Sequence, residues 1–219
     1  MSYRFSRLAA AVAAAGAGLF MAATVCAQVQ FPVPPPTPKV GEITKYRTVD
    51  LWNNSELGRS QNELVEVDKD GFVTRFTSTT VTQPRTARFT SEWQPCRSLQ
   101  NSNSSVCAGS FKFPMQVGNK HSYEKQPWPN GQGHSSGECE VKGTEKLTVP
   151  AGSFDTVVIE CKGHWNQVFG DAISGRQTET YWYAPALARP VRSEYFNFDP
   201  RGKPFTKNRT ELVEFIHAK

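Results

Sequence analysis

The stretch that most constrains this chain is Thr144–Glu160, TEKLTVPAGSFDTVVIE, which has the pattern of two β-strands joined by a tight turn. Apolar residues alternate before the turn, and β-branched and aromatic residues follow it. Between the two arms, Pro150 presets φ at the first turn corner, and Gly152 can adopt the positive φ that comes next. The pattern predicts a three-residue hairpin loop with a glycine bulge, in which Val149 lies opposite Ser153.

Four cysteines outside the N-terminal segment indicate two disulfides. Cys139 and Cys161 flank the hairpin, and Cys96 and Cys107 flank a polar, serine-rich stretch. Three pairings are open, and the simplest joins nearest neighbours, Cys96–Cys107 and Cys139–Cys161. In the predicted register Cys139 and Cys161 are diagonal neighbours, slightly too far apart for a relaxed disulfide, so we expect a bulge or bend at or next to Gly143. The cysteines lack the CxxC or histidine spacing of a zinc site.

Residues 1–27 are typical of a secretory signal peptide. Arg4 and Arg7 precede an uncharged, alanine-rich run, and Val25-Cys26-Ala27 has small residues at the cleavage positions, so we expect the mature chain to begin at Gln28. The alternatives are a membrane anchor, which the weakly apolar run disfavours, and a lipidated Cys26, which Val25 disfavours. We expect a periplasmic or secreted protein with no transmembrane span after cleavage.

The remaining chain is predicted to be a proline-rich, poorly ordered tether at residues 28–40 and a single antiparallel β domain at residues 41–219. Turn residues separate short strand-like runs, and no window shows helical spacing beyond two turns. The expected fold is all-β, with a strongly curved antiparallel sheet that forms a half-barrel or barrel and has few or no helices; a β-sandwich is the second choice. The predicted strands are Glu42–Trp52, Gln61–Val67, Phe72–Val81, Thr86–Trp93, Gln177–Ala184, Val191–Phe198 and Phe205–Ile216.

Few catalytic chemistries have a signature in this sequence. It has no HExxH, GxGxxG or Walker pattern, and we predict no catalytic residue, metal ligand or cofactor. The formal net charge of +5 is spread along the chain and gives no reason to expect nucleic-acid binding. A glycoside hydrolase would need two carboxylates across a cleft. Such a pair could come from Asp155, Glu160, Asp171 and Glu179.

The run Tyr181-Trp182-Tyr183 is the most informative feature for binding. Successive strand residues point to opposite faces, so both faces of this strand carry aromatic rings. A sheet that is apolar on both faces must be covered on both or must line a cavity. The run therefore indicates either a filled core or a ligand cavity lined by some of these residues, with Trp128 and His134 on the loop Pro127–Gly137 as a lid.

Three segments resemble a recurrent pattern of uncharacterised bacterial envelope β-proteins. They are Phe113-Pro114 with Val117-Gly118, Thr148–Phe154 (TVPAGSF), and Tyr181–Pro185 (YWYAP) with Val191. Those proteins are distantly similar in build to half-barrel lipoprotein carriers, and the resemblance, over about half of the mature chain, implies fold more than activity. This chain differs by its two cysteine pairs.

The function expected from the residues and the resemblance is that of a non-catalytic exported envelope protein. It would bind a lipid or other amphiphile, or a protein partner. The alternative is a secreted hydrolase that acts on a polysaccharide or another envelope substrate.

Overall fold

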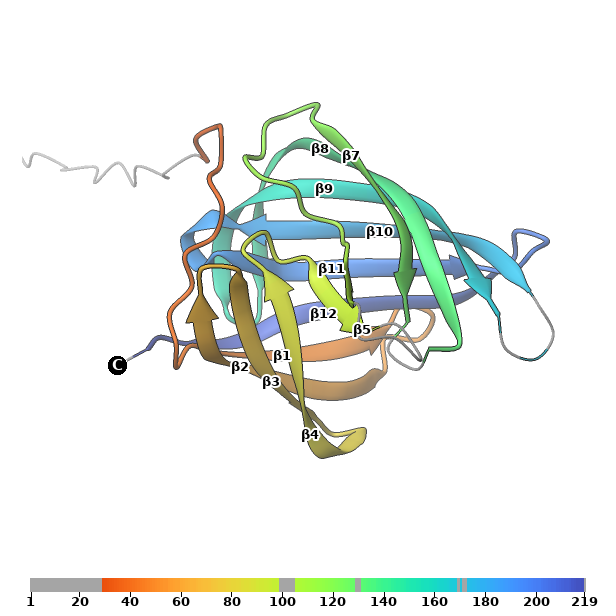
Figure 1. Ribbon diagram of the computed structural model, residues 1–219, viewed down its shortest axis with the longest axis horizontal. Helices are drawn as coiled ribbons and strands as arrows, with labels where there is room; N and C mark the ends of the chain where they lie inside the picture. Colours follow the sequence, from red (N-terminus) through yellow and green to blue (C-terminus); the bar gives the residue numbers. More distant parts are fainter. Residues whose placement is uncertain (1–28, 99–104, 129–130, 169, 171–172, 219) are drawn as a thin grey trace, which may run out of the picture.

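The computed structural model describes residues 29–98, 105–128, 131–168, 170 and 173–218. In this part of the chain, one twelve-stranded antiparallel sheet curves until it is nearly closed into a barrel (Figure 1). A short 3₁₀ turn, η1 (Pro185–Leu187), connects two of the strands. The strands are β1 (Ile43–Asp50), β2 (Glu56–Asp68), β3 (Gly71–Ser78), β4 (Val81–Thr90), β5 (Pro95–Ser98), β6 (Ser105–Cys107), β7 (Lys120–Pro127), β8 (Gly133–Val149), β9 (Gly152–Gln167), β10 (Ser174–Ala184), β11 (Arg189–Phe198) and β12 (Pro204–Ile216).

The strand order is that of two meanders joined side by side. Strands pair with their neighbours in sequence, and the first strand pairs with the last, β1 with β12. The two ends of the sheet are therefore β6 and β7, which are consecutive along the chain. The expected all-β, strongly curved antiparallel sheet is confirmed, and the sheet has the barrel form that was preferred over a sandwich.

The β8–β9 hairpin has the disulfide and the irregularity that the cysteine positions predicted. Both nearest-neighbour disulfides are present, Cys96–Cys107 and Cys139–Cys161. Cys139 lies directly opposite Cys161, and the register shifts between Val141 and Gly143. Gly143 has a φ of 154°, which favours glycine, so the expected irregularity next to this residue is confirmed.

The predicted register at the tip of this hairpin is wrong by one residue. Val149 pairs with Gly152 and not with Ser153, so Pro150 and Ala151 alone form the loop. Gly152 has a φ of 135° and already belongs to β9, which removes it from the turn. A single extra residue near Gly143 is then enough to bring the cysteines opposite one another.

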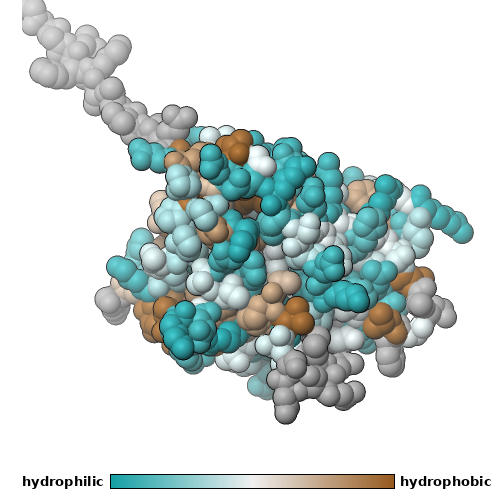
Figure 2. All heavy atoms as spheres, turned by 45° about the horizontal axis from the view of Figure 1, so that its top comes forward, coloured by the Kyte–Doolittle hydropathy of each residue, from teal (hydrophilic) through white to brown (hydrophobic). Residues whose placement is uncertain are grey.

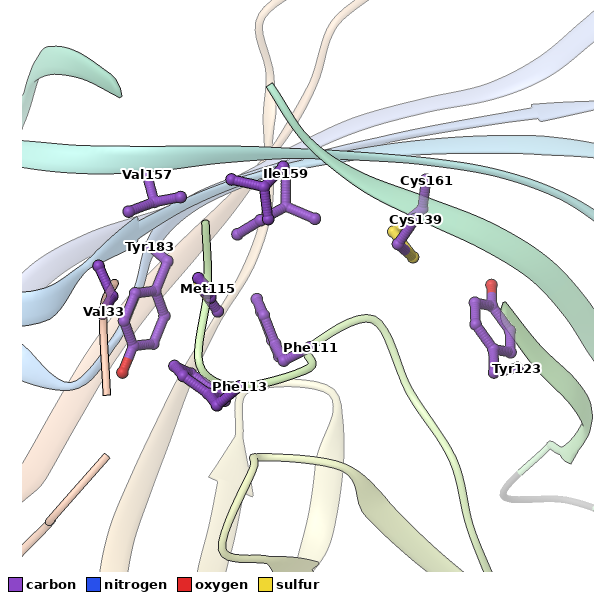
Figure 3. Packing of buried hydrophobic residues seen from close by; sticks show 11 residues of the cluster. Val33, Phe111, Phe113, Met115, Tyr123, Cys139, Val157, Ile159, Cys161 and Tyr183 are labelled. Atoms are coloured by element: carbon purple, nitrogen blue, oxygen red, sulfur yellow. A yellow bond between two sulfur atoms is a disulfide. The ribbon is translucent and has the colours of Figure 1, made fainter. Parts of the chain in front are cut away.

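The interior of the barrel is occupied by the segment between β6 and β7. Residues 108–119 form no strand and place Phe111, Phe113 and Met115 against the inner face of the sheet (Figure 3). We call this segment the inner segment. The buried cluster around it consists of Val33, Phe111, Phe113, Met115, Tyr123, Cys139, Val141, Val157, Ile159, Cys161 and Tyr183.

The predicted tether packs on the domain instead of extending away from it. Val33 is 3% exposed and exchanges two backbone hydrogen bonds of 2.9 Å with Met115 of the inner segment. Pro36 and Pro38 are also buried. The described residues of this stretch therefore help to fill the barrel, whereas the predicted signal peptide lies outside the described residues.

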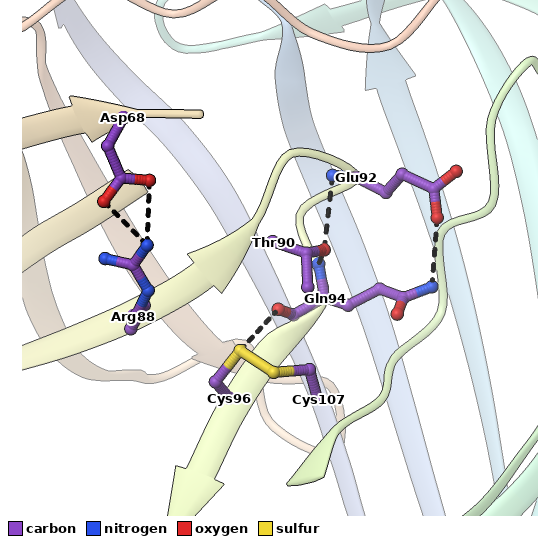
Figure 4. Close-up of a disulfide and its surroundings, with 7 residues drawn as sticks. All are labelled: Asp68, Arg88, Thr90, Glu92, Gln94, Cys96 and Cys107. Carbon is purple, nitrogen blue, oxygen red and sulfur yellow. Dashed lines mark hydrogen bonds and ion pairs between the residues drawn. A yellow bond between two sulfur atoms is a disulfide. The ribbon is translucent and has the colours of Figure 1, made fainter. Parts of the chain in front are cut away.

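The turn between β4 and β5 holds the inner segment in place. The side-chain amide of Gln94 donates a 3.0 Å hydrogen bond to the carbonyl of Phe111, and the backbone N–H of Phe113 donates to the Glu92 carboxylate at 3.3 Å. Glu92 and Gln94 lie next to the Cys96–Cys107 disulfide that links β5 to β6 (Figure 4). The β4–β5 turn, the disulfide-linked pair β5 and β6, and the inner segment follow one another in the chain. These contacts link all three at the edge of the sheet.

The tip of the β8–β9 hairpin covers a second apolar cluster. The backbone N–H of Ala151 donates to the Leu212 carbonyl of β12 at 3.2 Å. This cluster comprises Leu147, Val149, Ala184, Val191 and Leu212, with Trp182 among the partly buried residues around it. The face of the molecule seen in Figure 2 is mainly hydrophilic, with apolar residues in small, separate groups.

Removal of the Cys139–Cys161 disulfide should lower the free energy of unfolding by ~3 kcal/mol, since the bridge closes a long loop of the unfolded chain. Its cysteines are 22 residues apart, against 11 for Cys96–Cys107. The entropy model therefore predicts that the double variant Cys96→Ala/Cys107→Ala loses ~0.6 kcal/mol less than Cys139→Ala/Cys161→Ala. Urea unfolding without reductant measures both. An equal or larger loss in the Cys96/Cys107 variant contradicts this order.

Candidate ligand-binding site

The barrel is only partly filled, and its described residues line two adjoining cavities of substantial volume. The larger has a volume of about 380 Å³ and the smaller of about 260 Å³. Phe89, Trp93 and Phe111 line both, so these three aromatic side chains lie where the cavities meet. The larger volume lies within the range of small-molecule sites, roughly 300–1,000 Å³.

The inner face of β10 supplies a row of polar side chains to the larger cavity. Gln177, Glu179 and Tyr181 all line it, as expected from the two-residue period of a strand. Tyr183 continues the row but is 1% exposed and packs against Phe111 and Phe113, with ring centroids 5.9 and 5.5 Å away. The polar row therefore ends in the filled core.

Gln177 is the centre of a hydrogen-bond network in this cavity. Its Oε1 accepts from Ser135 Oγ and from Tyr195 OH, both at 3.4 Å, and its Nε2 donates to Tyr123 OH at 3.4 Å. Gly137 makes room for the tyrosine, because a Cβ at this position would lie 2.9 Å from Tyr123 OH. The side-chain amide of Gln177 in β10 is thus hydrogen-bonded to side chains of β7, β8 and β11, which holds the polar wall of the cavity in place.

Glu179 is the acidic group of this wall. Its Oε2 accepts a 2.8 Å hydrogen bond from Tyr181 OH, which in turn accepts from Ser110 Oγ of the inner segment at 3.3 Å. Burial raises the pKa of the Glu179 carboxyl above its ordinary value, and the hydrogen bond from Tyr181 opposes this shift. Burial first, and then the nearby Glu179 charge, raise the pKa values of Tyr123 and Tyr195 to about 12.

Trp128 forms part of the cavity wall and is held at both ends. Its Nε1 donates to Ser135 Oγ at 3.0 Å, and its backbone N–H donates to the Gly133 carbonyl at 2.9 Å. The ring packs so closely over Gly133 that a Cβ there would lie 2.6 Å from Trp128 Cζ3. The prediction of a long exposed loop over Pro127–Gly137 is wrong, because β7 runs to Pro127 and β8 begins at Gly133.

The structure places the four predicted ligand-binding residues in three different environments. Trp128 and Tyr181 line the larger cavity, whereas Tyr183 belongs to the filled core. Trp182 lies on the opposite face of β10, where its Nε1 donates to Glu145 Oε2 at 2.8 Å and Arg192 stacks over its ring. His134, predicted with Trp128 as a lid, is half-buried and does not line this cavity.

Several residues that line the larger cavity were not predicted from the sequence as ligand-binding residues. The period of β10 could have pointed from Tyr181 back to Glu179 and Gln177. The period of a single strand does not reveal the residues that distant strands contribute to the same wall. These are Arg97 of β5, Tyr123 of β7, Ser135 of β8 and Tyr195 of β11.

The fold does not bring together the carboxylates considered for hydrolysis. Among the described residues lining the larger cavity, Glu179 is the only carboxylate. Glu160 alternates with the buried Ile159 and Cys161 and so faces the other side of the sheet, and Asp155 lies near the hairpin tip, outside the cavity lining. Asp171 lies outside the described residues.

The described residues contain no group of three or more His, Cys, Asp or Glu side chains placed to hold a metal ion. No helix in the described part of the chain is long and apolar enough to cross a membrane. The two disulfides indicate an oxidising, extracytoplasmic compartment.

The fold is similar to solved structures from bacteria. No family model matches the chain, and no curated protein matches it. A candidate lipoprotein from Parabacteroides distasonis is 15% identical with a TM-score of 0.51, over 85% of this chain and 100% of that one. A candidate exported protein with a YmcC-like fold from Bacteroides fragilis is 15% identical with a TM-score of 0.50, over 84% and 99%.

These similarities confirm, at the level of fold, the resemblance to uncharacterised envelope β-proteins of barrel build. The identity is too low for the comparison to carry a function from either protein to this chain.

Replacement of Glu179 by Gln should change how stability depends on pH. Because the carboxyl pKa is raised in the folded state, its contribution to stability is fully present below the ordinary value of 4.5 and is lost as the pH rises through the raised pKa. Glu179→Gln keeps an acceptor for Tyr181 and removes this loss. Thermal unfolding of both proteins from pH 4 to pH 8 should show the variant gaining stability relative to the wild type as the pH rises. A pH-independent difference contradicts the burial of this carboxyl.

Proposed function

We propose that this protein is a non-catalytic exported envelope protein that binds an amphiphilic ligand inside its barrel. The observation that carries the proposal is the larger cavity, in which aromatic rings and converging polar groups line a space of about 380 Å³. Such a mixture of apolar wall and few oriented polar groups is typical of ligand sites. The adjoining cavity is lined by Phe89, Trp93 and Phe111 on the shared side and could receive an apolar chain.

Export is supported by three independent features. The N-terminal residues have the pattern of a signal peptide, and the domain contains two disulfides. The proteins of similar fold include one described as a candidate lipoprotein and one described as a candidate exported protein. We infer that the domain works in the periplasm or outside the cell, with Gln28 as the first residue of the mature chain.

Hydrolysis of a polysaccharide is the weaker alternative. A glycoside hydrolase of the usual type needs two carboxylates on either side of the scissile bond. The described cavity offers Glu179 without a second carboxylate. Binding requires nothing beyond the groups that already line the cavity.

The proposal predicts that protein purified without detergent from its own envelope retains a small molecule. Native mass spectrometry should detect a mass increment that disappears after denaturation, and the same compound should be recovered by solvent extraction. If the native protein carries no increment and dihexanoyl phospholipids do not bind to it, the proposal is wrong.

Trp128→Ala should weaken binding of such a ligand by about tenfold, as expected for the loss of ~1.4 kcal/mol of ring contact. The matched control is Trp52→Ala, because Trp52 is 57% exposed and lies outside both cavities. Titration calorimetry with a dihexanoyl phospholipid should show unchanged affinity for the control. Equal losses in both variants, or in neither, would count against the cavity as the binding site.

A further inference from the structure

The larger cavity carries two opposite charges that do not neutralise each other. Glu179 of β10 and Arg97 of β5 both line it, yet no ion pair joins them. The two groups stand on strands that are far apart in the sheet order, since five steps lead from β5 to β12 and two more lead to β10. They therefore face a common space from different walls.

Glu179 has a hydrogen-bond donor but no cationic partner. Tyr181 OH donates to its carboxylate, and among the described lysines and arginines none lies within ion-pair distance of it. A carboxylate removed from water without a matching cation is unfavourable, which is the cause of its raised pKa. A ligand that brings a positive N–H donor to this position would remove the cost.

Arg97 lacks the anionic partner that comparable arginines have. It is half-buried, and no carboxylate of the described chain is within ion-pair distance of it. Burial lowers its pKa. The other buried or half-buried arginines of the described chain each form an ion pair with a carboxylate: Arg47, Arg88, Arg189, Arg192 and Arg209. Residues 99–104, which follow β5 in the sequence, include no acidic residue.

A ligand with one charge would satisfy one of these groups and leave the other unpaired. A zwitterion satisfies both. Guanidinium groups bind phosphate through paired, charge-assisted hydrogen bonds. An ammonium group pairs with a carboxylate and is attracted to aromatic faces, and Tyr123, Tyr181, Tyr195 and Trp128 line the same cavity.

We propose that the larger cavity binds a zwitterionic group that joins a primary ammonium to a phosphate, as phosphoethanolamine does. Arg97 would hold the phosphate, and Glu179 with its neighbouring tyrosines would hold the ammonium. A primary ammonium is favoured over a quaternary one because the Glu179 carboxylate presents oxygen acceptors, which need N–H donors. This inference rests on the proposed function and specifies the polar end of the ligand.

Calorimetric titration of the refolded, ligand-free protein tests the inference with four probes. These are dihexanoyl phosphatidylethanolamine, dihexanoyl phosphatidylcholine, dihexanoyl phosphatidylglycerol and free phosphoethanolamine. The ethanolamine lipid should bind at least about tenfold more tightly than the glycerol lipid, which lacks the ammonium, and more tightly than the choline lipid. Free phosphoethanolamine binding as tightly as the lipid would identify the soluble compound as the source of the group.

Three variants separate the roles of the charges. Glu179→Gln should abolish the preference for ethanolamine over glycerol, and Arg97→Gln should weaken all phosphate-bearing probes by about tenfold. Arg85→Gln is the matched control, because Arg85 is an exposed arginine of β4 outside both cavities, and it should bind like the wild type.

The outcomes distinguish the inference from the function on which it rests. If the lipids bind equally well, or if Glu179→Gln keeps the ethanolamine preference, the zwitterion inference is wrong while ligand binding stands. If none of the four probes binds to the wild type, the inference fails, and native mass spectrometry of the envelope-purified protein decides whether the binding function fails with it.

Discussion

The width of the barrel is the constraint on which the rest of this structure depends. Eight strands enclose a space that their own side chains fill, whereas sixteen or more leave a channel. Twelve strands lie between these cases, and here a piece of the chain itself enters the interior. The inner segment, with Phe111, Phe113 and Met115, fills part of the space, and Val33 pairs with it from the N-terminal side. The cavities are what this filling leaves over.

The candidate site follows from this incomplete filling and from two-residue periodicity. One face of β10 begins polar at Gln177 and Glu179 and ends aromatic at Tyr183, so the same strand supplies both the wall of the cavity and part of the core. Glycines opposite the large rings make the arrangement possible: a side chain at Gly133 would collide with Trp128, and one at Gly137 would crowd Tyr123. These glycines thereby leave room for the polar wall of the larger cavity next to the buried apolar cluster.

The sequence predicted local features well and tertiary ones poorly. Turn residues and alternation gave the fold class, and cysteine spacing gave both disulfides and the irregularity beside Gly143. The aromatic run at Tyr181–Tyr183 showed that both faces of a strand must be covered. What covers them depends on contacts between distant residues: the inner segment on one face and the hairpin tip on the other. The proline-rich stretch looked like a tether because nothing local reveals that Val33 pairs with Met115.

Amide hydrogen exchange at Met115 tests most directly whether the inner segment occupies the barrel. Its N–H donates to the Val33 carbonyl at 2.9 Å in the interior of the barrel. Neither residue belongs to one of the twelve strands. The account predicts that the Met115 amide exchanges as slowly as that of Ile159 in β9, because both need the barrel to open. Exchange of Met115 as fast as that of Lys69, in an exposed turn, while Ile159 stays protected would contradict it, since the cavities would then lose the wall that the inner segment provides.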